Sequence, residues 1–243
     1  MLSKSQIKLI TSLKQKKYRQ QHGFFVVEGI KTIKELLQSN WMLHALYTTE
    51  SFNNSANPDN CRDEVLISES DLKRISFLTT PNKALAVFKI PESNLIADNG
   101  LILALDAIRD PGNLGTIIRL CDWFGVKDLV CSKETVDCFN PKVIQATMGS
   151  ITRVNISYVD LVAFLKESKM PIYGAFMEGE TVYTKNLSHK SILVMGNEAN
   201  GVSKEVEALI NEKISIPRFG NLQATESLNV ATATAILLSE FRR

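Results

Sequence analysis

Short apolar strands alternate with helices through the second half of this chain, and this order constrains the fold more than any other feature. Residues 101–106 (LILALD) form a continuous apolar run, which is typical of a strand buried on both faces of a parallel sheet. Further strands are expected, with helices between them, at 128–132, 151–159, 171–177, 191–196 and 213–217. The alternation predicts an α/β domain whose parallel sheet carries helices on both faces.

The first 92 residues predict a second, smaller α/β unit. Helices are expected over 1–20 and 30–39 and after Ser70, and strands at 24–29, 43–49, 65–68 and 84–90. Residues 91–100 (PESNLIADNG) have the proline, asparagine and glycine of a linker. We therefore expect two domains, residues 1–92 and 98–243.

Composition argues against several classes of protein. No run of 18 apolar residues exists, so no membrane-spanning segment is expected. The first residues lack the apolar core of a secretory signal. The four cysteines form no C-x-x-C pair and suit a reduced, cytoplasmic compartment. The three histidines are scattered, so no metal site is predicted.

Positive charge is concentrated near the beginning of the chain. Residues 1–40 contain eight lysines and arginines against two glutamates, which leaves six positive charges, whereas the whole chain has a net charge of only +2. Such a segment can follow the phosphates of a nucleic acid. A solvated helix face explains it equally well at this point.

Three expected strands end in polar, glycine-bearing loops that lead into helices. The segment DAIRDPGNLGTIIR follows the strand that begins at residue 101. GNEANG follows the strand at 191–195, and the loop to ESLNV follows the strand at 214–217. Ligands of open α/β sheets bind beyond the carboxyl ends of strands, so a composite pocket is predicted there. Its polar side chains are Asn113, Arg119, Glu198, Ser227 and Asn229, a set suited to holding hydroxyls and phosphates.

The loops lack the common nucleotide signatures. Neither G-x-G-x-x-G nor G-x-x-x-x-G-K-[ST] occurs, which argues against a nicotinamide oxidoreductase and an ATP cradle. Each candidate also has a plain structural alternative. Ser227 or Asn113 would cap a helix, Arg119 would form a surface ion pair, and Glu198 would be a turn residue.

The segments DPGNLGTIIR, VMGNEANGVS and IPRFG…SLNVA resemble, in order and placement, the three signature motifs of the SpoU (TrmH-type) RNA 2′-O-ribose methyltransferases of the SPOUT superfamily. The resemblance covers about residues 98–243. Residues 1–92 are similar to the ribosomal-protein-like substrate-binding domain often fused ahead of it. The implied fold is a knotted (trefoil) parallel-sheet methyltransferase domain preceded by a small α/β RNA-binding domain.

The resemblance also implies a cofactor and a set of site residues. S-adenosylmethionine would be held largely by backbone groups at Gly196, Ile216 and Leu228; as a structural alternative, these are a turn glycine and two core residues. The family's catalytic positions fall on the five polar residues named above. Because arginine stays protonated in proteins, we hypothesise that Arg119 clamps the phosphate beside the target ribose, while Ser227 and Asn229 position the hydroxyl and Glu198 orders Arg119 or the loop.

Partners follow from the same resemblance. We expect a homodimer through the knot domain and an RNA substrate, ribosomal rather than transfer RNA. The RNA contacts expected in the basic segment are Lys14, Lys16, Lys17 and Arg19. Two alternatives stay open, a catalytically silent RNA-binding or ribosome-assembly protein and a SPOUT base methyltransferase. The six residues between Gly220 and Ser227 form a longer loop than expected, which leaves the contacts of Arg218 and Phe219 open.

Overall fold

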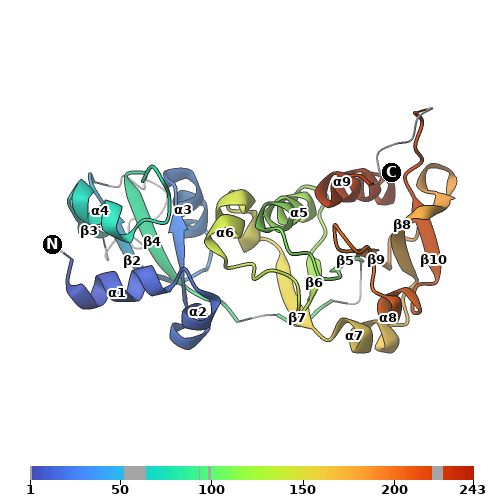
Figure 1. Cartoon of the computed structure of the whole chain (residues 1–243), viewed down its shortest axis with the longest axis horizontal. Coiled ribbons are helices and arrows are strands. Elements are labelled where there is room, and N and C mark those ends of the chain that lie inside the picture. Colours follow the sequence, from blue (N-terminus) through green and yellow to red (C-terminus); the bar gives the residue numbers. More distant parts are fainter. Residues whose placement is uncertain (1, 52–63, 93, 98–99, 221–226) are drawn as a thin grey trace. The chain divides into compact units, whose positions relative to one another are not determined.

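The computed structural model describes residues 2–51, 64–92, 94–97, 100–220 and 227–243 (Figure 1). It divides into two compact units. The first consists of Met1–Glu92 together with Asp137–Thr152, and the second of Ser93–Val136 together with Arg153–Arg243. The chain therefore enters the first unit twice.

The first unit is built on a four-stranded sheet of order β1-β4-β2-β3. The strands are β1 (Phe24–Glu28), β2 (Leu43–Thr48), β3 (Glu64–Leu66) and β4 (Ala84–Lys89). β4 runs antiparallel to β1 and β2, and β3 is parallel to β2. The helices are α1 (Lys4–Ser12), α2 (Lys16–His22), α3 (Ile30–Leu37) and α4 (Glu69–Ile75). All four strands lie where the sequence predicts them.

Two details of the first unit differ from the sequence prediction. The single helix expected over 1–20 is two helices, because the chain turns at Leu13–Gln15. The cap of α4 is Ser68, whose Oγ accepts the backbone N–H of Asp71 at 3.1 Å, and not Ser70. Ser3 caps α1 in a reciprocal arrangement with Gln6.

The second unit has a six-stranded sheet of order β10-β8-β9-β5-β6-β7. All the pairings between these strands are parallel, which confirms the predicted parallel α/β class. The strands are β5 (Leu101–Leu105), β6 (Asp128–Ser132), β7 (Asn155–Val159), β8 (Ile172–Thr181), β9 (Ser191–Met195) and β10 (Glu212–Ser215). β5 and β9 are buried along their whole length, as their continuous apolar sequence requires.

Helices cover both faces of this sheet (Figure 1). α5 (Pro111–Trp123) and α9 (Val230–Phe241) pack together on one face, and α7 (Leu161–Glu167) and α8 (Lys204–Glu207) lie on the other. Ile102, Ala104 and Val194 of the central strands meet Leu165 of α7 and Val206 of α8 in one core cluster. The trefoil knot stays a prediction of the family resemblance.

The segment between β6 and β7 packs within the first unit. It contains α6 (Pro141–Thr147) and the short 3₁₀ turn η2 (Ser150–Thr152). α6 contacts β1, and the Phe139 ring lies 4.9 Å from that of Phe25 and 6.2 Å from that of Trp41. Pro141 starts the helix, as predicted, because its missing N–H would have no partner in a first turn.

None of the described helices is long and apolar enough to cross a membrane. Across those same residues, no group of three or more His, Cys, Asp or Glu side chains is arranged to hold a metal ion.

Candidate active site

One hydrogen-bonded chain of side chains joins the three predicted loops at the carboxyl ends of β5, β9 and β10. Asn113 donates from Nδ2 to Oε1 of Glu198 at 3.0 Å, across 85 residues of sequence. Asn229 donates from Nδ2 to Oδ1 of Asn113 at 2.8 Å, across 116 residues. Each loop supplies one member, so the structure brings together three of the five polar residues that the sequence analysis singled out.

Local capping places the helices that carry this chain. The carboxylate of Asp110 accepts the backbone N–H of Asn113 at 2.7 Å and caps α5. Oδ1 of Asn229 accepts the N–H groups of Ala231 at 2.9 Å and Thr232 at 3.2 Å and caps α9. The alternatives in which Asn113 or Ser227 is the helix cap are therefore wrong, because Asp110 and Asn229 occupy those positions.

Asn197 is a site residue that the sequence analysis missed. Its Nδ2 donates to the carbonyl oxygen of Ala107 at 2.6 Å, and its Oδ1 accepts the N–H groups of Ala199 at 3.0 Å and Asn200 at 3.1 Å. It thus shapes its own loop and ties that loop to the end of β5. Its position between Gly196 and Glu198 in the second motif was the available signal.

Ala107 explains why this tie is needed. Its φ of 58° lies in the left-handed region, which a residue with a Cβ rarely adopts. Its carbonyl is held by Asn197, and its N–H donates to Oγ of Ser132 at 3.0 Å. Such backbone strain persists only where neighbours hold it, and it gathers at functional sites. The strained turn redirects the chain from β5 toward α5.

Asp106 makes a second connection between the same two loops. The side chain is buried, and its Oδ2 accepts the N–H of Ser203, just before α8, at 2.7 Å. Asp106 was visible in the sequence as the polar residue that ends the run LILALD. Its partner was not, because Ser203 lies 97 residues further along.

Gly196 allows two backbones to approach closely. A Cβ at this position would lie 2.3 Å from the carbonyl carbon of Gly201 and 2.3 Å from the nitrogen of Val202. Asn197 and Gly201 exchange backbone hydrogen bonds of 2.8 Å and 2.9 Å in the same loop. No side chain fits here, so glycine is required for the shape of the loop itself. The cofactor contact of Gly196 stays a prediction.

The remaining predicted residues lie on the same helices and loops as this network. Arg119 is exposed on α5 and forms no hydrogen bond or ion pair with any residue that the structure describes. Ser227 is exposed, Leu228 is 48% exposed, and Ile216, just after β10, is half-buried. Leu228 is therefore not a core residue, contrary to its structural alternative. The long loop over 221–226 lies outside the described residues.

Covalent chemistry through a cysteine has no support in this region. Cys121 lies on α5, two residues after Arg119, but its side chain is fully buried. Burial raises the pKa of the Cys121 thiol far above its ordinary value, and the charge of Asp122 raises it further. A thiol that stays protonated is a poor nucleophile.

The four predicted RNA-contacting residues separate into two groups. Lys14, Lys16 and Lys17 are exposed. Arg19 is only 2% exposed, and it forms an ion pair with Asp137. The burial of Arg19 argues against its predicted contact with RNA, because its guanidinium is already bonded to Asp137 and to two backbone carbonyl oxygens.

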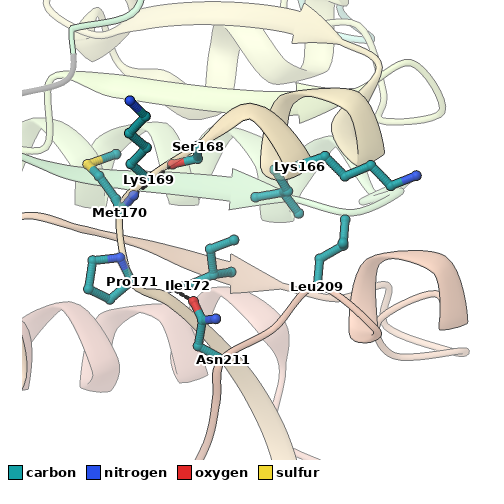
Figure 2. Close-up of a pocket in the computed structure, with 9 residues that line it drawn as sticks. Lys166, Ser168, Lys169, Met170, Pro171, Ile172, Leu209 and Asn211 are labelled. Carbon is teal, nitrogen blue, oxygen red and sulfur yellow. Dashed lines mark hydrogen bonds between the residues drawn. The ribbon is translucent and has the colours of Figure 1, made fainter.

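A shallow hollow lies away from the strand-end loops (Figure 2). It is formed by the end of α7, the start of β8, Leu209 and Asn211, and the amide of Asn211 accepts the N–H of Ile172 at 2.8 Å. Lys166 and Lys169 point away from each other in this view. The hollow lies at the amino end of β8, so it is separate from the candidate site.

Known protein families match both parts of the chain. The model of the SpoU rRNA Methylase family matches residues 100–239, and that of the MRM3-like substrate binding domain matches residues 4–86. The chain is 31% identical over 234 residues to the 23S rRNA (guanosine(2553)-2′-O)-methyltransferase RlmP of Bacillus subtilis (strain 168), which covers 93% of this chain and 92% of the relative.

Two solved structures share the whole fold. A TrmH-family protein from Porphyromonas gingivalis is 41% identical with a TM-score of 0.90, covering 100% of this chain and 98% of that one. The AdoMet-bound rRNA methyltransferase from Sinorhizobium meliloti is 28% identical with a TM-score of 0.84, covering 100% and 95%. Fold, site and relatives together define an RNA methyltransferase of the SPOUT class. The chain belongs to the SpoU rRNA methylase family.

Proposed function

We propose that this protein transfers a methyl group from S-adenosylmethionine to a ribose 2′-hydroxyl of ribosomal RNA. The observation that carries the proposal is the hydrogen-bonded chain Glu198–Asn113–Asn229, which joins the three motif loops at the carboxyl edge of the parallel sheet. The presence of all five polar residues at the positions of the family's motifs argues against an RNA-binding protein without activity. The strained Ala107 and the ties to it point the same way.

The residues present fit the cofactor. Leu228, directly before Asn229, is exposed, and Ile216, directly after β10, is half-buried, so both offer apolar surface that suits the faces of an adenine ring. The second loop is shaped by backbone contacts around Gly196 and not by charged side chains, which suits binding through main-chain groups. When bound, S-adenosylmethionine supplies an electrophilic methyl group on its sulfonium.

Arg119 is the residue that acts on the RNA. Its exposed guanidinium is available to grip, through two parallel N–H donors, the phosphate next to the target ribose. A fixed positive charge there lowers the free energy of an alkoxide forming at the 2′-oxygen. Arg119 is a clamp in this proposal and not a proton acceptor, because a guanidinium stays protonated.

The other four residues hold the reacting groups in place. Both ends of the Asn113 amide and of the Asn229 amide are already bonded within the protein, so these side chains fix the loops. Glu198 bonds Asn113, which makes it an orienting residue for the first loop. Ser227 is exposed three residues before the first residue of α9, and in this proposal its hydroxyl contacts the substrate. Precise orientation of this kind accounts for much of the rate of a displacement reaction.

We propose separate roles for the two parts of the chain. Residues 1–92 bind the RNA, and residues 98–243 carry the methyl transfer. The proposed assembly is a homodimer through the knot domain, supported by Trp123, which is 84% exposed on α5, the helix that packs beside α9. Light scattering of the purified chain, compared with Trp123→Glu, measures this state directly.

The decisive experiment has two arms. In cells, the 2′-O-methyl groups of total RNA are mapped with and without this gene, and one methyl is expected to vanish from a ribosomal RNA. In vitro, the purified chain is incubated with labelled S-adenosylmethionine and deproteinised ribosomal RNA, and the product linkage is expected to resist nuclease and alkali. Label in a base would support the base methyltransferase instead. Binding of S-adenosylmethionine without transfer to any RNA would favour the silent assembly protein.

A further inference from the structure

Three exposed lysines of the first unit lie at a turn that is held by a buried arginine. Lys14, Lys16 and Lys17 flank the turn between α1 and α2. Arg19 folds back beneath this turn, and its Nη1 donates to the carbonyl oxygens of Leu13 and Lys14, both at 2.9 Å. α2 has no side-chain cap at Gln15, so Arg19 supplies the side-chain bonds that hold the turn.

The buried charge of Arg19 is balanced from far along the chain. Its Nε and Nη2 both donate to Oδ2 of Asp137, at 3.0 Å and 2.5 Å. The first acidic residue in the sequence is Glu28, so α1 and α2 contain no carboxylate of their own. Asp137 lies 118 residues away and still belongs to the same compact unit. A buried guanidinium left without such a partner is strongly unfavourable.

Further contacts fix Asp137 and the segment that follows it in place. Oδ1 of Asp137 accepts the N–H of Phe139 at 3.1 Å, and the Phe139 ring packs against Phe25 and Trp41. Glu35 of α3 lies directly against Gly149, where an added Cβ would be 2.6 Å from that of Glu35. The segment 137–152 is therefore built into the first unit by packing as well as by charge.

We propose that Asp137 is a positioning residue for RNA binding, which acts through Arg19 to hold the turn that presents Lys14, Lys16 and Lys17 to the phosphates. This inference rests on the proposed RNA substrate. The segment 137–152 follows β6 in the methyltransferase sequence, and it works as part of the RNA-binding unit. Tyr18 adds aromatic surface to the same turn, with Nζ of Lys17 5.9 Å from its ring centre and the His22 ring stacked at 6.4 Å.

The variant Asp137→Asn separates this role from simple electrostatics. Removing a negative charge makes the protein more basic, so charge alone predicts tighter RNA binding. The positioning role predicts the opposite, because an uncompensated Arg19 leaves the turn and the lysines lose their fixed arrangement. Asparagine keeps the Oδ1 bond to Phe139. We expect about a tenfold loss of affinity for deproteinised ribosomal RNA, since preorganisation is lost. Binding of S-adenosylmethionine should stay within about twofold of the wild type, because no contact of its proposed site changes.

Three variants of the full chain complete the experiment. Asp71→Asn removes the same charge from the same unit, where Asp71 pairs with Arg74 at 3.1 Å, and should leave RNA affinity unchanged or slightly higher. Phe139→Leu weakens the packing of the segment and should lower the melting temperature without lowering RNA affinity. Replacing Lys14, Lys16 and Lys17 by alanine should weaken binding and flatten its dependence on salt.

Each outcome of these measurements either supports or overturns the inference. Equal or tighter RNA binding by folded Asp137→Asn overturns the inference, as does a parallel loss of S-adenosylmethionine binding. An equal loss of RNA affinity in Phe139→Leu also overturns it, since a general loosening would then explain the effect. If the triple lysine variant keeps its affinity, the turn is not the RNA contact. The proposed function is judged separately, by methyl transfer from the wild-type chain.

Discussion

Two regions of this molecule hold a polar surface in place, and they do so by different means. The strand-end site of the second unit is fixed by amide side chains and one carboxylate that lie inside recognisable motifs. The basic turn of the first unit is fixed by one buried ion pair, whose acid lies outside any motif. Amide networks tolerate partial exposure, whereas a buried ion pair depends on both partners. The strand-end site could therefore be predicted from the sequence, whereas the arrangement of the basic turn could not.

The largest expected effect concerns Arg119 in the strand-end site of the second unit. Arg119→Ala should reduce methyl transfer by about 10²–10³-fold, because the charge that stabilises the developing alkoxide is lost. Arg119→Lys should recover little of this if the clamp is bidentate, and most of it if a point charge suffices. Single-turnover transfer and S-adenosylmethionine affinity are measured together, and the affinity should not change.

Lys166→Ala is the matched control for Arg119→Ala, since it removes a cation from α7 on the opposite face of the sheet. Its transfer rate should equal that of the wild type. An equal loss in both variants would mean that total charge, and not the position of Arg119, drives the reaction.

The second prediction breaks the amide network and keeps the helix cap. Asn229→Asp retains the oxygen that caps α9 but places a second oxygen against Oδ1 of Asn113. Transfer should fall by about 10- to 100-fold, because the loops that carry the reacting groups lose their fixed arrangement. The melting temperature should change little. Asp160→Ala removes the comparable cap of α7, with Ala163 at 3.0 Å, and should lower stability by about 1 kcal/mol without affecting transfer.

The third prediction concerns the strained turn at Ala107. Asn197→Ala should lower the free energy of unfolding by about 1–2 kcal/mol, because a hydrogen bond to a strained loop is lost. Glycine adopts a positive φ freely, so Ala107→Gly should reduce the need for this tie. Urea unfolding of both single variants and the double variant is expected to give a coupling of about 0.5–1 kcal/mol. Strict additivity would show that Asn197 does not hold Ala107.

The smallest expected effect is a pH dependence of folding stability that arises from Glu28 in the first unit. Burial raises the pKa of the Glu28 carboxyl above its ordinary value of 4.5, against opposing hydrogen bonds from Ser76 and Phe77. Between that value and the raised pKa, the folded protein binds more protons than the unfolded chain, so the contribution of Glu28 is complete below pH 4.5 and is lost as the pH rises through the raised pKa.

The variant Glu28→Gln keeps an oxygen for the N–H of Phe77 and removes this titration. Its stability relative to the wild type should therefore improve as the pH rises from about 4.5 toward 7, by no more than about 1 kcal/mol. Chemical unfolding at a series of pH values measures the trend. Glu92→Gln, at an exposed position, controls for the loss of a charge. A trend of opposite sign would refute the assignment.

Local sequence patterns were sufficient to predict the strands and helices and most residues of the candidate site. The alternation of strands and helices predicted the parallel sheet, because burial of β5 and β9 on both faces requires continuous apolar runs. The caps were less predictable. Ser70 and Ser227 each have a neighbour, Ser68 and Asn229, with the same hydrogen-bonding ability, and only the backbone geometry selects between them.

The sequence by itself determined the alternation of elements, the three motif loops and the polar residues within them, because each depends on neighbours a few positions away. Only the tertiary structure decided that Arg19 is buried while its neighbouring lysines are exposed, that Asn197 ties Ala107, and that 137–152 packs with the first unit. Those outcomes depend on partners 90 to 118 residues apart. The charge of a side chain follows from its residue type, but its burial depends on the residues that the tertiary structure packs against it.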